Sequence, residues 1–279
     1  MGFIYMSINQ INKKFRLIVI GDEILSGKRQ DKHLSKLIEL LSERGLTISG
    51  AEYVGDEPDL ITATLRRSFA TGDAVFSTGG IGSTPDDHTR QCAAKALDLP
   101  LSLHPEAQHL IKGRILTMAE GDPVKSNLNT ADNQQRMRMG EFPVGSEIIP
   151  NPYNQIPGFS IKEHYFLPGF PVMAGPMMAW VLDTYYKHLF HQVDFIEKGF
   201  IVPMAMESSL TPLMETIENS YPSIKVFSLP SVGDPSRGGV FAKRHIELGV
   251  KGSSALVDAA FLELRRGVVE LGHEIYDLH

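Results

Sequence analysis

Cysteine, long apolar runs and an excess of positive charge are all scarce in this 279-residue chain. Cys92 is the only cysteine, which excludes an internal disulfide and a zinc site built from several thiolates. The formal net charge is −6, whereas general nucleic-acid binders need a basic excess to displace counterions. We therefore expect a globular protein of a reducing compartment that binds no nucleic acid.

No segment of the sequence is typical of a leader or a membrane span. Residues 1–15 lack the apolar core of a signal peptide, and Met6 stands where N-myristoylation needs Ser or Thr. Residues 166–186 form the most apolar window, but the prolines and the aspartate within it favour a buried turn and helix over a membrane span. We expect a cytoplasmic protein with no membrane partner.

Signatures of several common enzyme classes are also missing. The 10 histidines show no HxxxH or HExxH spacing, and no GxSxG elbow of a serine hydrolase occurs. The stretch GDEILSGKR differs from a P-loop, because five residues separate Gly21 from Gly27 and Arg29 replaces the Ser or Thr. The run at 80–85 differs from the dinucleotide fingerprint, because Pro85 replaces its third glycine.

The first half of the chain alternates between strand and helix patterns. Apolar runs ending in glycine or turn residues predict strands at 15–20, 46–54 and 73–78, and periodic stripes predict helices at 31–44, from 58 onward and at 86–97. This order is typical of an α/β fold with a doubly wound, mostly parallel sheet. Ligands bind such sheets beyond the carboxyl ends of the strands, which here are the segments Gly21–Gly27, Val54–Asp59 and Thr78–Thr89.

The rest of the chain predicts the completion of this domain and a second one. Residues 101–140 are typical of a helix followed by a polar segment, 147–171 of short strands with tight turns, and 171–190 of a helix. From residue 198 a strand–helix–strand–strand–helix order resembles a small ferredoxin-like α+β domain. We expect an N-terminal extension at 1–14, an α/β domain at 15–192 and the smaller α+β domain at 193–279.

The stretch STGGIGSTPDDHTRQ at 77–91 supports two interpretations. Thr84 followed by Pro85 and, three positions after the threonine, by Asp87 is typical of a capped helix start. The glycines at 79, 80 and 82 would also let backbone N–H groups approach an anion at the positive end of that helix. Two adjacent carboxylates repel an anion unless a cation intervenes, so the second interpretation predicts a phosphate or pterin-like site assisted by a divalent metal.

Acidic residues follow the other two strand ends as well. Asp22 and Glu23 follow the first strand, where they can ligate a metal, bind ligand hydroxyls, or simply cap the turn into the next helix. Asp56 follows the second strand and has the same alternatives, since it can be the N-cap of the helix that begins near Pro58.

With these three loops in place, the chain resembles the molybdopterin-binding (MoaB/MogA-like) domain family, in particular its CinA-type branch. The stretches that carry the resemblance are GDEILSG (21–27), VGDEP (54–58), STGGIGSTPDDHT (77–89), PNPYNQIPGF (150–159) and FLPGFP (166–171). The second domain is similar to the small α+β module that follows in CinA-type proteins. The chain ends before the place where the C-terminal nicotinamide-nucleotide deamidase domain of full-length CinA begins, so we expect that activity to be absent.

The resemblance implies a set of site residues. Asp87 and Asp56 match the acidic positions expected to be catalytic, and Asp87 with Glu23 would hold a divalent metal, Mg²⁺ or Co²⁺. The candidate ligand-binding residues are Gly21, Asp22, Glu23, Thr78, Gly79, Gly80, Gly82, Ser83, Asp86, Thr89, Pro157, Gly158, Pro168 and Gly169. The asparagine-lysine-glutamine segment of the family is present here only as residues 133–136, so Arg136 or Arg138 becomes the candidate positive charge.

The resemblance also implies two functions. Members bind molybdopterin or its adenylated form, whereas CinA-type N-terminal domains are associated with metal-dependent hydrolysis of the pyrophosphate of ADP-ribose-like nucleotides. We expect such a nucleotide pyrophosphatase, with a molybdopterin- or nucleotide-binding protein without turnover as the alternative. The family further implies a homo-oligomer with a small-molecule nucleotide or pterin ligand.

Overall fold

The structure is a computed structural model that describes residues 13–192 and 195–278. The N-terminal extension expected at 1–14 therefore lies outside the described residues up to position 12. The described chain falls into two compact units that divide between Phe190 and His191, each of which has its own sheet and its own apolar core. No helix among the described residues is both long enough and apolar enough to span a membrane.

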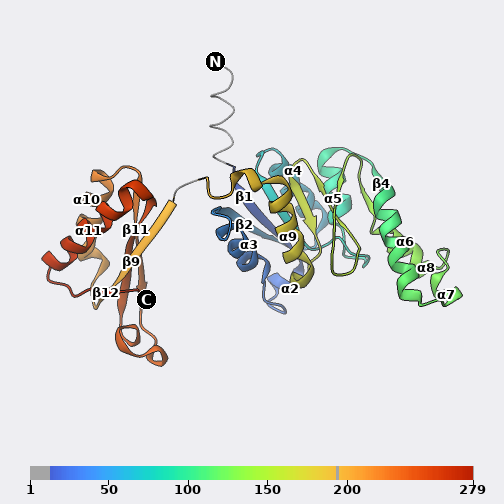
Figure 1. Ribbon diagram of the computed structural model, residues 1–279. Coiled ribbons are helices and arrows are strands. Elements are labelled where there is room, and N and C mark those ends of the chain that lie inside the picture. The colour runs from blue at the N-terminus through green and yellow to red at the C-terminus, as the bar shows by residue number, and fades with distance from the viewer. Residues whose placement is uncertain (1–12, 193–194, 279) are drawn as a thin grey trace, which may run out of the picture. The chain divides into compact units, whose positions relative to one another are not determined.

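The first unit contains a mostly parallel central sheet, as expected from the alternating pattern (Figure 1). The strand order is β2-β1-β3-β8-β7-β6. The parallel part comprises β2 (Ile48–Val54), β1 (Phe15–Ile20), β3 (Ala74–Thr78) and β8 (His164–Leu167). The strand β7 (Gly158–Ile161) pairs antiparallel with β8 and with β6 (Glu147–Ile149). Side chains of β1 and β3 are buried almost without interruption, because helices cover both faces of the sheet.

Helices form the two outer layers of this unit. On one face pack α3 (His33–Ser42) and α9 (Pro171–Tyr185), and on the other pack α4 (Pro58–Phe69) and α5 (Thr89–Leu97). Leu37 and Leu41 pack with Met177 and Met178 in the first core, so these two methionines of α9 fill core space. A four-residue helix, α2 (Asp22–Leu25), directly follows β1.

The helix expected at 86–97 begins later, at Thr89, and the capping prediction is wrong. Residues Thr84–Asp87 form a turn, in which the N–H of Asp87 donates to the carbonyl of Thr84 at 3.0 Å. The Asp87 carboxylate accepts from the backbone N–H of Thr84 at 2.7 Å and from its hydroxyl. These hydrogen bonds engage the Asp87 carboxylate before the helix begins. His88 is the N-cap of α5, and its side chain makes no capping hydrogen bond. An aspartate side chain can accept hydrogen bonds from groups of its own turn, and here these bonds form in place of a helix start at Thr84.

Residues 101–140 contain more structure than one helix and a polar segment. They form β4 (Leu101–Leu103), α6 (Pro105–Ala119), α7 (Pro123–Ser126) and α8 (Ala131–Arg138), and β4 pairs with β5 (Glu141–Pro143). The polar segment becomes helical because Asp122 and Thr130 cap its two short helices through their side chains. In Figure 1 the helices α6, α7 and α8 lie together at the end of the unit beyond β4.

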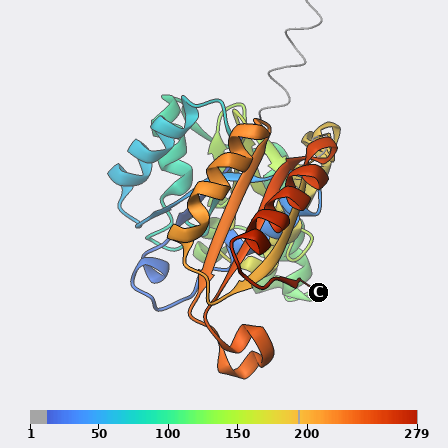
Figure 2. The same ribbon diagram turned by 90° about the vertical axis from the view of Figure 1, so that its left-hand side faces the viewer.

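The second unit is an antiparallel sheet with two helices on one face (Figure 2). Its elements are β9 (Phe195–Pro203), α10 (Glu207–Ser220), β10 (Ile224–Ser231), β11 (His245–Ser253), α11 (Ser254–Glu270) and β12 (Tyr276–Asp277). The sheet order is β10-β11-β9-β12, which places the first and third long strands side by side. Leu210, Ile217, Val257 and Leu264 of the helices cover the apolar face of this sheet.

Candidate functional site

A pocket of about 400 Å³ lies beyond the carboxyl ends of β1, β3 and β8. It brings together most of the residues that the sequence singles out, as expected for an open α/β sheet. The predicted residues that line it are Gly21, Glu23, Asp56, Gly79, Gly80, Gly82, Ser83, Asp86, Asp87, Pro157, Pro168 and Gly169.

The glycine loop after β3 forms one wall, and two of its positions require glycine. Gly79 and Gly80 have φ values of 98° and 68°, in the left-handed region that other residues avoid. A Cβ on Gly79 would lie 2.1 Å from the carbonyl oxygen of Ile20, and one on Gly80 would lie 2.2 Å from Oγ1 of Thr89. The missing side chains therefore let this loop cross the end of β1 and rest on the start of α5.

Four consecutive backbone donors of this loop are free of protein partners. Among the residues that the structure describes, the N–H groups of Gly80, Ile81, Gly82 and Ser83 donate to no acceptor. All four residues line the pocket. The flanking N–H groups are used, since Gly79 donates to the carbonyl of Leu167 at 3.0 Å and Thr84 donates to Asp87. A run of free amides of this kind is a binding surface for anionic oxygens.

Asp22 and Asp56 join the ends of β1 and β2. The N–H of Asp22 donates to Oδ2 of Asp56 at 2.9 Å, and the N–H of Asp56 donates to Oδ1 of Asp22 at 3.2 Å. Burial is the largest effect on Asp56, and with the nearby carboxylates of Asp22, Glu23 and Asp86 it raises the pKa of this aspartate. The alternative role of Asp56 as helix cap does not occur, because Glu57 is the N-cap of α4.

Four of the predicted ligand residues lie outside the lining of this pocket, where the fold itself uses them. Asp22 faces Asp56, and Thr89 is buried with its hydroxyl donating to the carbonyl of Gly79 at 3.0 Å. A Cβ on Gly158 would lie 2.4 Å from the carbonyl oxygen of Phe166, so this glycine permits close strand pairing. Thr78 faces a smaller chamber described below.

Several pocket residues were not among the predicted site residues. The positive charge on the wall comes from Arg29, while Arg136 donates to Asn133 at 2.6 Å and neither Arg136 nor Arg138 lines the pocket. Met139 and Ile156, with Asn151, Asn154, Phe170 and Met173, complete the wall on the side of β7 and α9. The alternation pattern identifies strand ends, whereas Asn151, Asn154 and Ile156 lie in the loop between β6 and β7, and Met173 lies on α9.

Arg90 supports the glycine loop from behind. It is buried, and its guanidinium donates to the carbonyl of Gly82 at 2.7 Å and to the carbonyl of Arg138. Burial lowers the pKa of Arg90, against the opposite effect of the Asp87 and Glu141 carboxylates. The buried cation thus links α5, α8 and the loop beneath the pocket.

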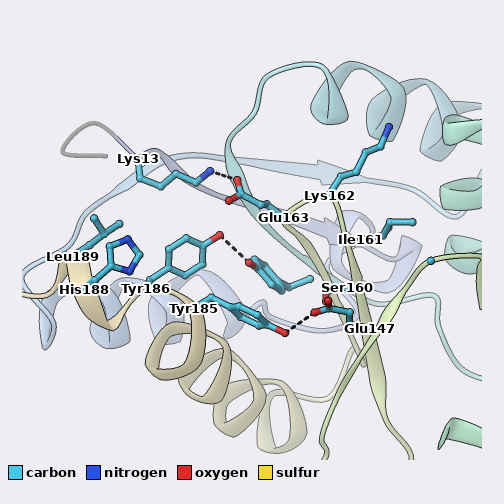
Figure 3. A pocket seen from close by; sticks show the side chains of 12 residues that line it. Lys13, Glu147, Ser160, Ile161, Lys162, Glu163, Tyr185, Tyr186, His188 and Leu189 are labelled. Atoms are coloured by element: carbon cyan, nitrogen blue, oxygen red, sulfur yellow. Dashed lines mark hydrogen bonds and ion pairs between the residues drawn. The ribbon is translucent and has the colours of Figure 1, made fainter. Parts of the chain in front are cut away.

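A second cavity, of about 490 Å³, lies at the opposite edge of the sheet (Figure 3). Its polar side chains satisfy one another: the hydroxyls of Tyr165 and Tyr186 are 2.8 Å apart, and Tyr185 donates to Glu147 at 3.0 Å. Burial raises the pKa values of both Tyr165 and Tyr186. The first pair connects β8 to the C-terminal end of α9 and the second connects β6 to α9. None of the predicted site residues lies there.

The candidate metal ligands Glu23 and Asp87 both line the first pocket. Between residues 13–192 and 195–278, no group of three or more His, Cys, Asp and Glu side chains is arranged to hold a metal ion. The proposed metal pair therefore stays a prediction.

Comparison with known proteins agrees with this geometry. Residues 16–188 match the family described as a probable molybdopterin binding domain. A protein of Caldivirga maquilingensis is 30% identical over 208 residues, which cover 72% of this chain and 75% of that one. A CinA-like protein of Anaeromyxobacter dehalogenans is 28% identical over 73% of this chain, but over only 49% of its own length. The chain thus spans about half the length of that CinA-like relative.

The crystal structure of the protein CinA with unknown function from Thermoplasma acidophilum resembles the chain at a TM-score of 0.52 and 25% identity. The match covers 61% of this chain and 98% of that one. The residues that the family model matches, 16–188, include the glycine loop and every residue that lines the pocket. The chain therefore belongs to the molybdopterin-binding domain family, in its CinA-type branch.

Proposed function

We propose that the pocket binds a nucleotide with a pyrophosphate, of the ADP-ribose class, and hydrolyses it with the help of a divalent metal. The observation that carries this proposal is the run of four backbone N–H groups, at 80–83, that have no partner among the described residues and lie in one pocket with acidic residues. The amides would bind phosphate oxygens and stabilise the charge that develops on them during the reaction.

The carboxylates of the same pocket would repel a phosphate on their own. Glu23 and Asp87 lie in the pocket with Asp56 and Asp86, whereas Arg29 is the only Lys or Arg side chain in the described lining. Mg²⁺ is commonly held by one or two protein carboxylates together with substrate phosphates, so a two-carboxylate donor set fits such a cation. When bound, a metal of this kind polarises the phosphoryl group and lowers the pKa of an attacking water.

Asp56 would take part by accepting the proton of the attacking water. Its raised pKa, caused mainly by burial, favours proton uptake more than that of an ordinary surface aspartate. The backbone N–H of Asp22 holds Oδ2 of Asp56, and Asp56 lines the pocket.

The test is the release of AMP from ADP-ribose with Mg²⁺ or Co²⁺, measured by chromatography. We expect turnover by the wild type and a loss of at least 100-fold in Asp87→Ala. Asp132→Ala is the matched control, since Asp132 is an exposed aspartate of α8 outside the pocket lining. Equal AMP release by the wild type and Asp87→Ala would contradict the proposal.

A second candidate is a pterin- or nucleotide-binding protein without turnover. It is favoured by the absence of a three-residue metal cluster in the described residues and by the engagement of Asp87 with Thr84. Calorimetry with molybdopterin and nucleotides distinguishes the two functions: saturable binding without any product supports this candidate.

A further inference from the structure

A small chamber adjoins the main pocket beneath the ends of β1 and β3. Its volume is about 60 Å³, and it shares Ile20, Glu23, Arg29 and Gly169 with the lining of the pocket. We call it the inner chamber. Its other walls include His33 of α3 and Thr78, the last residue of β3.

Both of these polar side chains are buried and have an atom without a partner. His33 is 4% exposed and Thr78 is 0% exposed. Within the part of the chain that the structure describes, Nε2 of His33 and Oγ1 of Thr78 form no hydrogen bond. Leaving a buried polar atom unpaired costs about 1–3 kcal/mol. Two such atoms on the walls of one chamber indicate a site that awaits a polar group.

Asp31 determines what His33 offers to the chamber. Nδ1 of His33 lies 2.8 Å from Oδ1 of Asp31. The same carboxylate accepts from the N–H of His33 and from the hydroxyl of Tyr53, both at 2.8 Å. Because a carboxylate can only accept, Nδ1 carries a proton, and Nε2 is an acceptor when the ring holds no second proton. The hydroxyl of Thr78 can both donate and accept.

The side chains of His33 and Thr78 together determine which chemical group can bind in the inner chamber. A hydroxyl can donate to His33 and accept from Thr78 at the same time, whereas an ionised phosphate oxygen can only accept. At about 60 Å³ the inner chamber is much smaller than the main pocket of about 400 Å³, and the free N–H groups of residues 80–83 line the pocket and not the chamber. We propose that the inner chamber binds one ribose hydroxyl of the nucleotide, held between His33 Nε2 and Thr78 Oγ1, with the phosphates on the glycine loop.

This inference rests on the proposed function only in that the pocket must bind a nucleotide. The probe is AMP, which has ribose hydroxyls but no pyrophosphate to be hydrolysed. We expect Thr78→Val to weaken AMP binding about tenfold in calorimetry, because one buried hydrogen bond is lost. Thr78→Ser should bind as the wild type does. In the wild type, either 2′-deoxy-AMP or 3′-deoxy-AMP should show the same loss, which Thr78→Val should not increase further.

The stability of the variants distinguishes recognition from a structural role. Thr78→Val removes an unpaired buried hydroxyl, so its Tm should not fall below that of the wild type. Ser77→Ala is the matched control, because Ser77 is also buried with an unpaired hydroxyl, on the neighbouring position of β3, but lines neither cavity. Ser77→Ala should retain full AMP affinity.

Equal AMP affinities of the wild type and Thr78→Val would overturn the inference and identify the chamber as a site for a buried water only. If the Thr78→Val effect is present but ADP-ribose is not hydrolysed, the inference stands and the proposed hydrolysis falls. If the wild type binds no AMP at all, the inference falls, and the proposed hydrolysis is decided by the release of AMP from ADP-ribose alone.

Discussion

Asp22 and Asp56 each accept a hydrogen bond from the backbone N–H of the other, at 3.2 and 2.9 Å. The two residues follow neighbouring parallel strands, so this exchange fixes the spacing of two loops at the edge of the pocket. It also explains why two carboxylates stay close together in spite of their repulsion.

Asp22→Ala should destabilise the first unit by about 1 kcal/mol, because the N–H of Asp56 loses its acceptor. Asp22→Asn retains an acceptor oxygen and should cost less than half as much. Urea unfolding followed by the fluorescence of Trp180, the only tryptophan and a residue of α9, reports on this unit. An equal cost for both variants would contradict the role of the hydrogen bond.

Gly79→Ala should lower the free energy of unfolding by about 3 kcal/mol or more. The added Cβ would collide with the carbonyl of Ile20, and alanine would also be strained at the positive φ of this position. Gly72→Ala is the matched control: Gly72 has a φ of 72°, but nothing lies within 4 Å of the added Cβ. We expect about 1 kcal/mol for the control, measured by the same unfolding experiment. Equal costs would show that the close approach to β1 is unimportant.

His164 should make the stability of the first unit depend on pH. Burial lowers the pKa of His164 from 6.5 to about 4, and its ring is bonded to Ser68 at 2.8 Å and to the carbonyl of Lys162 at 3.0 Å. The unfolded chain therefore binds a proton near pH 6.5 that the folded chain binds only near pH 4. The contribution of the uncharged His164 to the free energy of unfolding is fully present above pH 6.5. It is lost as the pH falls toward 4, and the loss is at most about 3 kcal/mol.

The measurement for His164 is urea unfolding at several pH values between 4 and 7.5. His164→Gln cannot titrate and should flatten the slope in this range, although its stability at pH 7.5 is lower. A slope equal to that of the wild type would assign the effect to other groups.

Tyr165 and Tyr186 should behave as a coupled pair. Each single change to phenylalanine leaves the other buried hydroxyl without its 2.8 Å partner and should cost about 1–2 kcal/mol. The double variant leaves no buried hydroxyl of this pair without a partner. Its loss of stability should therefore be smaller than the sum of the two single losses by about 1 kcal/mol. Additive costs in this double-mutant cycle would show that the hydroxyl pair contributes nothing.

The local sequence pattern was sufficient to predict a strand or a helix where the apolar residues of a segment followed a single periodicity. The run FRLIVI at 15–20 and the stripe of Leu37 and Leu41 predicted a buried strand and a helix, and both are present. The pattern was insufficient at 84–87, where a capped helix start and an isolated aspartate turn share the same residues. Only the bonds between Thr84 and Asp87 decide between them.

The sequence by itself determined the parallel sheet, the positions of its strand ends and the glycines of the loop, because these depend on periodicity and on backbone freedom. The tertiary structure alone decided which side chains share a cavity. Arg29 and His33 are distant in sequence from Thr78 and Gly169, and they meet at the inner chamber because β1, β3 and β8 end at one edge of the sheet. Hydrogen-bond partners, and therefore orphaned polar atoms, arise only from that arrangement.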